Sequence, residues 1–152
     1  MKIGILNGPN LNLLGIREPT VYGHTTLAEI EAHLQNVATT LDAQIITAQC
    51  NGEGQLIDVL HEWRGTVDGV VVNAGAYSHT SLALRDAFAA TSLLFVEVHL
   101  TNVYAREAER RHSMLAPAAL GVICGFGALG YEYALRALVT TLRDRALRPH
   151  VS

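Results

Sequence analysis

The sequence predicts an α/β protein of three layers, in which helices cover both faces of a five-stranded parallel sheet. Short apolar runs alternate along the 152 residues with segments whose apolar positions recur at helical spacing. This alternation is typical of parallel strands joined by right-handed helical crossovers. A chain of this length suits one hydrophobic core. We therefore expect residues 1–152 to form a single domain with the flavodoxin-like strand order 2-1-3-4-5.

The first half of the chain contains three of the expected strands. Residues 3–7 form the first apolar run, and a capping box of Thr26 and Glu29 begins a helix that extends to about residue 41. The remaining elements of this half are a strand at 44–49, a helix at about 53–64 and a strand at 69–72. Each helix has the spacing of apolar residues that buries one of its faces against a sheet.

The second half completes the alternating pattern. Thr80 or Ser81 can cap a helix that ends near Ala90, because a hydroxyl accepts a hydrogen bond from the first turn of a helix. Two further strands are expected at 93–98 and 119–124, followed by a helix at about 128–145. The stretch at about 99–118 has few helical signals and is rich in His, Arg and Glu.

Composition and charge exclude several classes of protein. The formal net charge is -3 without a block of basic residues, which argues against a nucleic-acid-binding surface. No apolar run approaches the roughly 20 residues that a membrane helix requires, and the first residues enter a strand without a signal-peptide pattern. Cys50 and Cys124 lie in apolar runs and are expected to be reduced, buried thiols. These features together predict a cytoplasmic protein.

One count restricts the chemistry further. The eleven basic residues are ten arginines and a single lysine, Lys2, which precedes the first strand. An imine intermediate or a phosphate-binding P-loop would each need a lysine at the site, and the position of Lys2 suits neither. The His and Cys residues also lack the spacing of a metal-ligand cluster, so no metal site is expected.

Polar residues follow four of the expected strands at their carboxyl ends, where open α/β sheets bind ligands. After the first strand comes Asn7-Gly8-Pro9-Asn10-Leu11-Asn12-Leu13-Leu14-Gly15, whose amides, glycines and proline favour an irregular ligand loop. The other ends carry Asn51, Asn73 with His79 close behind, and Glu97-Val98-His99. One asparagine after a strand is commonly a turn former. Four polar ends at one edge predict a pocket for a small, hydroxyl-rich anion.

Glu97 and His99 form the most suggestive pair at this edge. They are two residues apart on one expected strand, so their side chains point to the same face. A carboxylate beside an imidazole orients it and favours its protonated form, which suits a general acid. Pairing also has a structural explanation, because an unpaired buried carboxylate is costly. Arg106 and Arg110 could form a fork for a carboxylate ligand if they share a helical face, and a solvated charged turn is the alternative.

A glycine-rich motif follows the last expected strand. Gly125-Phe126-Gly127-Ala128-Leu129-Gly130 matches the G-x-G-x-x-G pattern, but the residues after it read as helix, without the further strand and acidic residue of a dinucleotide site. We interpret the motif as tight strand-to-helix packing. The residues alone leave two other functions open. One is a flavodoxin-like binding or signalling module with a phosphate at this turn, and the other is a structural oligomer with an apolar surface.

Several long motifs occur in a fixed order along the chain. They are Leu6–Gly15 (the loop quoted above with Leu6), Arg17-Glu18-Pro19, Tyr22-Gly23, Asn73–Ser81, Ala83–Ala87, Glu97–Asn102, Ala105-Arg106-Glu107, Arg111-His112-Ser113 and Gly121–Gly127. In this combination the chain resembles the type II 3-dehydroquinate dehydratases (3-dehydroquinases) over nearly its whole length. The resemblance implies a hydro-lyase that interconverts 3-dehydroquinate and 3-dehydroshikimate through an enolate, without a metal, cofactor or imine. It leaves open whether the protein serves the shikimate pathway, and hence aromatic amino acid biosynthesis, or quinate breakdown.

The resemblance also implies catalytic roles. Tyr22 would be the base that removes the proton beside the ketone, with Arg17 next to it on a mobile lid. A free tyrosine has a pKa near 10, so only about one molecule in a thousand is ionised at pH 7. A positive charge nearby would be needed to stabilise the ionised form. Asn10 would hold the water that stabilises the enolate. His99 would protonate the departing hydroxyl, and Glu97 would orient it.

Further residues would bind the substrate and the neighbouring subunits. By the same resemblance, Asn73, His79 and Arg110 would contact substrate hydroxyls. The backbone of Leu100 and Thr101 would bind the substrate carboxylate. Asp86 would reach the site of a neighbouring subunit, because the family forms trimers that assemble into homododecamers. Neither a nucleic acid nor a membrane is an expected partner.

Overall fold

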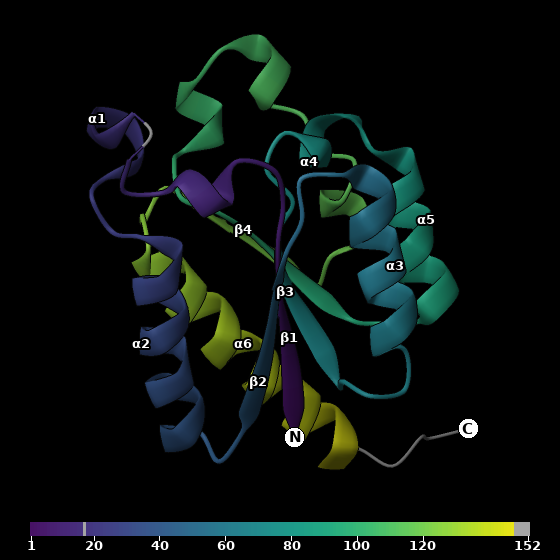
Figure 1. Cartoon of the computed structure of the whole chain (residues 1–152). Coiled ribbons are helices and arrows are strands. Elements are labelled where there is room, and N and C mark those ends of the chain that lie inside the picture. Colours follow the sequence, from purple (N-terminus) through teal and green to yellow (C-terminus); the bar gives the residue numbers. More distant parts are fainter. Residues whose placement is uncertain (17, 148–152) are drawn as a thin grey trace.

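A five-stranded parallel sheet forms the centre of the protein (Figure 1). The structure is a computed structural model and describes residues 1–16 and 18–147. The strands are β1 (Lys2–Asn7), β2 (Gln44–Gln49), β3 (Gly69–Asn73), β4 (Phe95–His99) and β5 (Gly121–Cys124). Their spatial order is β2-β1-β3-β4-β5 and all pairs are parallel. This confirms the predicted flavodoxin-like topology.

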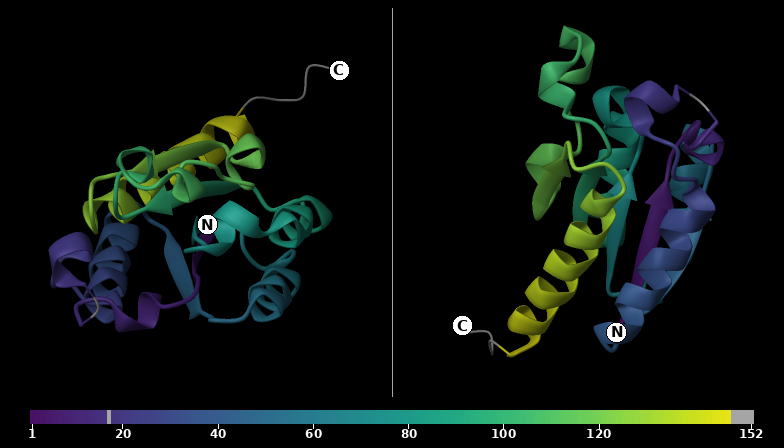
Figure 2. Two further views of the ribbon diagram at one scale, coloured as in Figure 1. Left: turned by 90° about the horizontal axis from the view of Figure 1, so that it is seen from above. Right: turned by 90° about the vertical axis from the view of Figure 1, so that its left-hand side faces the viewer.

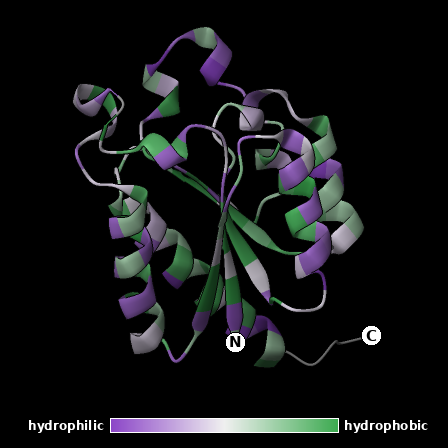
Figure 3. Cartoon of the chain, viewed as in Figure 1, coloured by the Kyte–Doolittle hydropathy of each residue, from purple (hydrophilic) through white to green (hydrophobic). Residues whose placement is uncertain are grey.

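Helices cover both faces of the sheet, as Figures 1 and 2 show. One face packs against α2 (Leu27–Thr40) and α6 (Leu129–Leu147), and the other packs against α3 (Glu53–Trp63) and α5 (Leu82–Thr91). Because successive residues of a strand point to opposite faces, Ile3 and Ile5 join the core of α2 and α6, whereas Leu6 joins the core of α3 and α5. The central strands are mostly hydrophobic (Figure 3), as expected for strands buried on both faces.

The predicted helix starts are present in the structure. The Thr26 hydroxyl accepts a hydrogen bond from Glu29 N at 3.2 Å, and the Glu29 carboxylate accepts one from Thr26 N at 2.7 Å. This capping box lowers the pKa of Glu29, because its carboxylate accepts hydrogen bonds from the backbone and then the side chain of Thr26. Of the two candidate caps for α5, Ser81 has the role, since its hydroxyl accepts a hydrogen bond from Leu84 N at 2.9 Å.

Short helical segments at the carboxyl edge of the sheet are the main difference from the prediction. They are α1 (Pro19–Tyr22), α4 (Tyr77–Thr80) and the 3-10 turns η1 (Leu11–Leu13), η2 (Val103–Ala105), η3 (Ala108–Arg110) and η4 (Ala116–Ala118). Segments this short contain too few residues to show a periodic apolar pattern. Arg106 and Arg110 therefore do not share one helix, because Arg106 is extended after η2 and Arg110 ends η3.

The last two strands begin two residues later than predicted, at Phe95 and Gly121. Before β4, Ser92 has a left-handed backbone conformation (φ 57°) at the C-terminus of α5. The next two residues lead the chain from this turn into the sheet. Before β5, the turn η4 occupies the residues up to Ala118. Apolar residues thus precede the paired part of each strand, so the apolar pattern predicted that each strand begins too early.

The two cysteines are free, as predicted, but the expectation that both are buried was wrong. Cys50 and Cys124 are each partly exposed. Cys50 directly follows β2 and Cys124 ends β5, and these are the two edge strands of the sheet. Edge strands are covered less completely than central ones, although burial still raises the pKa of the Cys50 thiol.

A close contact between two strand-end loops shapes the carboxyl edge. Gly8 N donates a hydrogen bond to Asn73 O at 2.7 Å, which extends the pairing of β1 and β3 by one residue. A β-carbon on Gly8 would lie 2.4 Å from Ala74 O and 2.5 Å from Ala74 C. These atoms are backbone and cannot rotate away. Glycine at this position therefore allows the loop after β1 to pack on the loop after β3.

We predict that Gly8→Ala destabilises the protein by about 1–3 kcal/mol, the cost of overpacking a close-packed interior. Gly54→Ala is the matched control, because a β-carbon there meets nothing within 4 Å. In the first turn of α3 that substitution should be neutral or stabilising by up to about 1 kcal/mol. Denaturant unfolding followed by circular dichroism measures both changes, and equal effects of the two substitutions would contradict the role of Gly8.

Candidate active site

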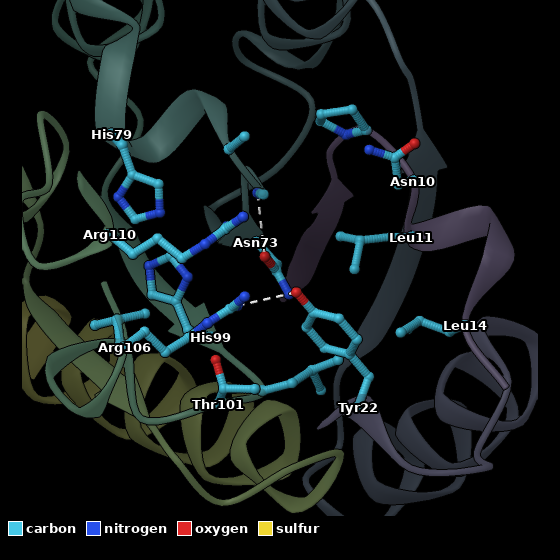
Figure 4. A pocket seen from close by; sticks show the side chains of 15 residues that line it. Asn10, Leu11, Leu14, Tyr22, Asn73, His79, His99, Thr101, Arg106 and Arg110 are labelled. Carbon is cyan, nitrogen blue, oxygen red and sulfur yellow. Dashed lines mark hydrogen bonds between the residues drawn. The ribbon is translucent and has the colours of Figure 1, made fainter. Parts of the chain in front are cut away.

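A cavity lies at the carboxyl edge of the sheet and is lined from five segments distant in sequence (Figure 4). The loop after β1, helix α1, the loop and α4 after β3, the end of β4 and the segment with η2 and η3 all contribute. The lining residues are Pro9, Asn10, Leu11, Leu14, Tyr22, Asn73, Gly75, Ala76, His79, His99, Leu100, Thr101, Val103, Arg106 and Arg110. The cavity therefore lies at the edge of the sheet where the sequence predicts the site.

The cavity brings together eight of the eleven residues expected to form the site. These are Asn10, Tyr22, Asn73, His79, His99, Leu100, Thr101 and Arg110. Glu97 lies behind the cavity wall and contacts it through His99. Asp86 does not line this cavity and lies on α5, beside a separate surface groove with Arg85 and Phe88. Arg17 is outside the described residues.

Tyr22 and Arg106 meet inside the cavity. Arg106 Nη1 donates a hydrogen bond to the Tyr22 hydroxyl at 2.9 Å, drawn as a dashed line in Figure 4, and the guanidinium carbon lies 5.6 Å from the centre of the tyrosine ring. The two residues are 84 apart in sequence. The contact therefore places a positive charge beside the Tyr22 oxygen.

Glu97 and His99 form the carboxylate–imidazole pair that their spacing predicts. His99 Nε2 lies 2.6 Å from Glu97 Oε1, and the Glu97 side chain is 0% exposed. The Ser113 hydroxyl also lies 2.8 Å and 2.9 Å from the two Glu97 oxygens. A fully buried carboxylate is tolerated when it is paired and hydrogen-bonded. With Nε2 directed at Glu97, Nδ1 is the ring nitrogen of His99 left for a ligand in the cavity.

His79 is held in one orientation by the backbone. Its Nδ1 lies 2.7 Å from His112 O, and because a carbonyl only accepts, Nδ1 donates the proton. The Nε2 atom of a neutral His79 ring is then an acceptor for a ligand hydroxyl. The rings of His79 and His99 are stacked, with centroids 6.0 Å apart, and they form one wall of the cavity (Figure 4).

A buried tyrosine connects the ends of β1 and β3 beneath the cavity. The hydroxyl of Tyr131, on α6, donates to Asn7 Oδ1 at 2.6 Å and accepts from Asn73 Nδ2 at 3.0 Å. Gly75 N donates to Asn73 Oδ1 at 3.2 Å. Asn73 is thus held on both ends of its amide, with one Nδ2 hydrogen still available. Among the described residues, Asn7 Nδ2 is the one buried side-chain atom without a hydrogen-bond partner.

Arginine supplies the positive charge at the rim of the cavity. Arg110 pairs with Glu107 through its Nε atom and lines the cavity beside Arg106. This hydrogen bond raises the pKa of the Arg110 guanidinium, which therefore remains charged. Two arginines above a wall of amide and imidazole groups suit a small polar anion. Arg106 and Arg110 both line the cavity, but separate turns place them there and not one helical face.

Three functional contacts were not foreseen from the sequence. The sequence predicted either a carboxylate fork or a solvated charged turn for Arg106. No sequence motif indicated that Arg106 contacts Tyr22. Ser113 stood in a quoted motif without a role. No sequence pattern predicted the contacts of Tyr131 with Asn7 and Asn73. A buried phenol that needs a hydrogen-bond partner was the one available signal for Tyr131.

The glycine motif between β5 and α6 is a tight connection, as interpreted from sequence. Gly125 and Gly127 have positive φ values of 94° and 57°, and Gly127 N donates to Leu100 O at 2.9 Å. A β-carbon on Gly130 would contact Val98 and Ile123 at 3.4 Å and 3.6 Å. Gly125 and Gly127 therefore turn the chain after β5, whereas a β-carbon at Gly130 would make only ordinary contacts with the sheet.

Residues 1–16 and 18–147 lack two kinds of feature. None of their helices combines the length and the apolar character needed to cross a membrane. Within the same residues, no group of three or more His, Cys, Asp or Glu side chains could hold a metal ion.

The fold and the cavity define a flavodoxin-like enzyme with a polar cavity at the carboxyl edge of its sheet. A tyrosine beside an arginine and a histidine beside a buried carboxylate face one cavity at the edge of a flavodoxin-like sheet. The family model described as dehydroquinase class II matches residues 1–139. The chain belongs to this family, a family of hydro-lyases, as the sequence motifs indicated.

Relatives and solved structures agree with this membership. The chain is 70% identical over 142 residues to a 3-dehydroquinate dehydratase of Gemmatimonas aurantiaca, and the match covers 93% of each chain. It is similar to the type II dehydroquinase structure from Butyrivibrio crossotus, with 40% identity and a TM-score of 0.88 over 91% of this chain and 97% of that one. The structure from Propionibacterium acnes has 37% identity and a TM-score of 0.87 over 91% and 96%.

We predict that Tyr131→Phe lowers the free energy of unfolding by about 1–3 kcal/mol, because it leaves buried Asn7 Oδ1 and Asn73 Nδ2 without their partner. Tyr133→Phe is the control on the same helix, since the Tyr133 side chain is 43% exposed. It should change the stability by less than about 0.5 kcal/mol. Denaturant unfolding at neutral pH measures both, and a Tyr131→Phe protein as stable as the parent would contradict the proposed network.

The same tyrosine predicts how stability changes at high pH. Burial raises the pKa of the Tyr131 hydroxyl above its ordinary value. Above about pH 10 the tyrosine of the unfolded chain releases its proton while the folded one retains it, so stability is fully present below this pH and is lost as the pH rises. Tyr131→Phe should reduce this loss between about pH 9 and 11, and Tyr133→Phe should not. Unfolding curves across this pH range measure the slope, and identical slopes in all three proteins would refute the assignment.

Proposed function

We propose that the protein removes water from 3-dehydroquinate to give 3-dehydroshikimate, and catalyses the reverse reaction. The observation that carries this proposal is the single cavity shared by two reactive pairs, Tyr22 with Arg106 and His99 with Glu97. Elimination beside a ketone needs a base for the carbon-bound proton and an acid for the departing hydroxyl. The family and the named relatives support the choice of substrate. The reaction would serve the shikimate pathway or quinate breakdown.

Tyr22 acts as the base in this proposal. Its phenolate takes the proton from the carbon beside the ketone, and the electron pair of the broken C–H bond forms an enolate. Arg106, in direct contact with the hydroxyl, stabilises the phenolate before the transfer. Arg17 would add a second positive charge, as the family resemblance implies. Such charges act strongly when water is excluded from the site, since the effective dielectric constant is then low.

His99 acts as the acid. The enolate electrons return to form the carbon–carbon double bond, the C–O bond breaks, and His99 gives a proton to the departing oxygen so that water leaves. Glu97 accepts a hydrogen bond from Nε2 of the ring and stabilises its protonated form. Asn10 lines the opposite side of the cavity, and in this proposal it holds a water that donates to the enolate oxygen. The base and the acid act from opposite walls, which suits an anti elimination.

The remaining polar groups bind the substrate. Asn73 and His79 present a free amide hydrogen and a ring nitrogen to the substrate hydroxyls, and their other polar atoms are engaged with the protein. Arg110 binds a further hydroxyl, and the backbone of Leu100 and Thr101 holds the carboxylate. Groups that the protein has already oriented lose less entropy when the substrate binds.

We further propose an assembly of trimers into a homododecamer, in which Asp86 approaches the site of a neighbouring subunit. Asp86 lies on α5 and does not line the cavity of its own chain. A contribution to a neighbour's site is compatible with that position. Light scattering in solution tests the assembly.

An absorbance assay tests the proposed activity directly. The product is a conjugated enone that absorbs in the ultraviolet, whereas 3-dehydroquinate lacks this conjugation. Folded protein mixed with 3-dehydroquinate should give a rising absorbance. No change in absorbance with folded protein, at any concentration of substrate, would refute the proposed function.

We predict that Tyr22→Phe lowers kcat at least about a hundredfold, because proton transfer by a positioned group contributes about 10²–10⁴-fold. A saturated analogue of the substrate should still bind, since the ring remains. Tyr104→Phe is the matched control, because Tyr104 is 62% exposed on the nearby turn η2 and does not line the cavity. Its kcat should equal that of the parent. Full activity of Tyr22→Phe in the enone assay would overturn the choice of base.

A further inference from the structure

The hydroxyl of Ser113 contacts both oxygens of the buried Glu97 carboxylate, 16 residues away in sequence. The same oxygen accepts hydrogen bonds from Leu115 N at 3.1 Å and from Ala116 N at 3.0 Å. A serine hydroxyl has one hydrogen to donate and two lone pairs that accept. Both lone pairs are therefore occupied by backbone N–H groups, and the single hydrogen is directed at Glu97.

This arrangement determines the protonation state that Glu97 can adopt. Ser113 has no acceptor site left for the hydrogen of a protonated carboxyl, so such a hydrogen could bond only to His99 Nε2 among these contacts. The one Ser113 hydrogen is shared between Glu97 Oε1 and Oε2, and Oε1 also contacts His99 Nε2. Each of these contacts favours the carboxylate over the carboxyl form. The hydrogen of the Glu97–His99 contact lies on one of these two side chains, and the hydrogen bond from Ser113 favours His99 Nε2.

We propose that Ser113 is a positioning residue that keeps Glu97 ionised and so presents His99 as an imidazolium with its transferable proton on Nδ1. The inference rests on the proposed function, in which His99 is the acid. Without Ser113 the shared proton moves to Glu97 in part of the molecules. The ring that faces the cavity is then a neutral imidazole, which is a weaker acid than an imidazolium.

Other charged and titratable groups lie near this pair. His79 stacks on the His99 ring from α4, and Tyr22, Arg106 and Arg110 line the same cavity. The Ser113 hydroxyl itself bonds Glu97, Leu115 and Ala116. A change at Ser113 therefore acts on the Glu97–His99 pair first.

The test compares Ser113→Ala with Ser113→Thr, which retains a hydroxyl. We expect Ser113→Ala to lower kcat about tenfold to a hundredfold, part of the contribution of a general acid, with KM changed by less than about threefold. The basic limb of its kcat profile should move to higher pH, because a carboxylate with fewer hydrogen bonds holds the shared proton more strongly. Ser113→Thr should restore the rate and the parent profile. A lower rate with an unmoved pH profile would indicate a merely structural role and overturn the proposal.

Infrared spectroscopy provides a readout that does not depend on activity. With isotope-labelled glutamate, Ser113→Ala should show the carbonyl stretch of a protonated carboxyl group at neutral pH, and the parent and Ser113→Thr should not. The double variant Ser113→Ala, Glu97→Gln identifies the residue, because the band should disappear. An unprotonated Glu97 in Ser113→Ala would refute the proposal. Absence of turnover in the parent, with the band as predicted, would refute only the proposed function.

Two further variants separate the effect on Glu97 and His99 from a general loss of stability. Ser113→Cys keeps the volume and a weak donor, so it replaces Ser113→Ala if that protein fails to fold, and the same band and shift are expected in smaller measure. Thr91→Val removes a buried hydroxyl on α5 that bonds the carbonyls of Ala87 and Phe88. It should change stability without changing the pH profile. A shifted profile in Thr91→Val would show that the effect is not specific to Ser113.

Discussion

Parallel pairing of the strands in register is the constraint on which the site depends. The pairing places Asn7 opposite both Gln49 and Asn73, and His99 opposite Cys124. The last residue of each strand therefore lies at one edge, and the loops that follow rise from that edge together. A shift of one residue in any pair would turn its side chains to the other face of the sheet. The apolar cores on both faces fix the register and thereby fix the cavity.

Buried polar groups at this edge must be satisfied, and their partners also orient the site. Tyr131 reaches from α6 to the ends of β1 and β3 and holds Asn73. Ser113 reaches from the segment before η4 to Glu97, and Glu97 holds His99. An unpaired buried carboxylate or phenol would cost more than an ordinary hydrogen bond contributes. The hydrogen bonds that make burial tolerable are thus the same ones that set the direction of each functional side chain.

The sequence was sufficient for the sheet order and for contacts that follow from local spacing. The period of two residues along a strand predicted that Glu97 and His99 share a face, and the period of the helix predicted the covering layers. Contacts between distant short segments could not be predicted in this way. Arg106 reaches Tyr22 across 84 residues of sequence, and neither α1 nor η2 is long enough to show a periodic pattern. Tyr22 itself was selected through the family resemblance, and the structure then placed it in the cavity beside a guanidinium.

The central claim is that the base and the acid are separate groups on opposite walls of one cavity. Hydrogen exchange in deuterated water tests it most directly, with 3-dehydroquinate and the variants Tyr22→Phe and His99→Gln followed by nuclear magnetic resonance. The account predicts that His99→Gln still exchanges the proton beside the ketone for deuterium while it releases almost no product, because Tyr22 forms the enolate without the acid. Tyr22→Phe should show neither exchange nor product. Exchange that persists in Tyr22→Phe, or that is lost in a folded His99→Gln protein, would contradict the account.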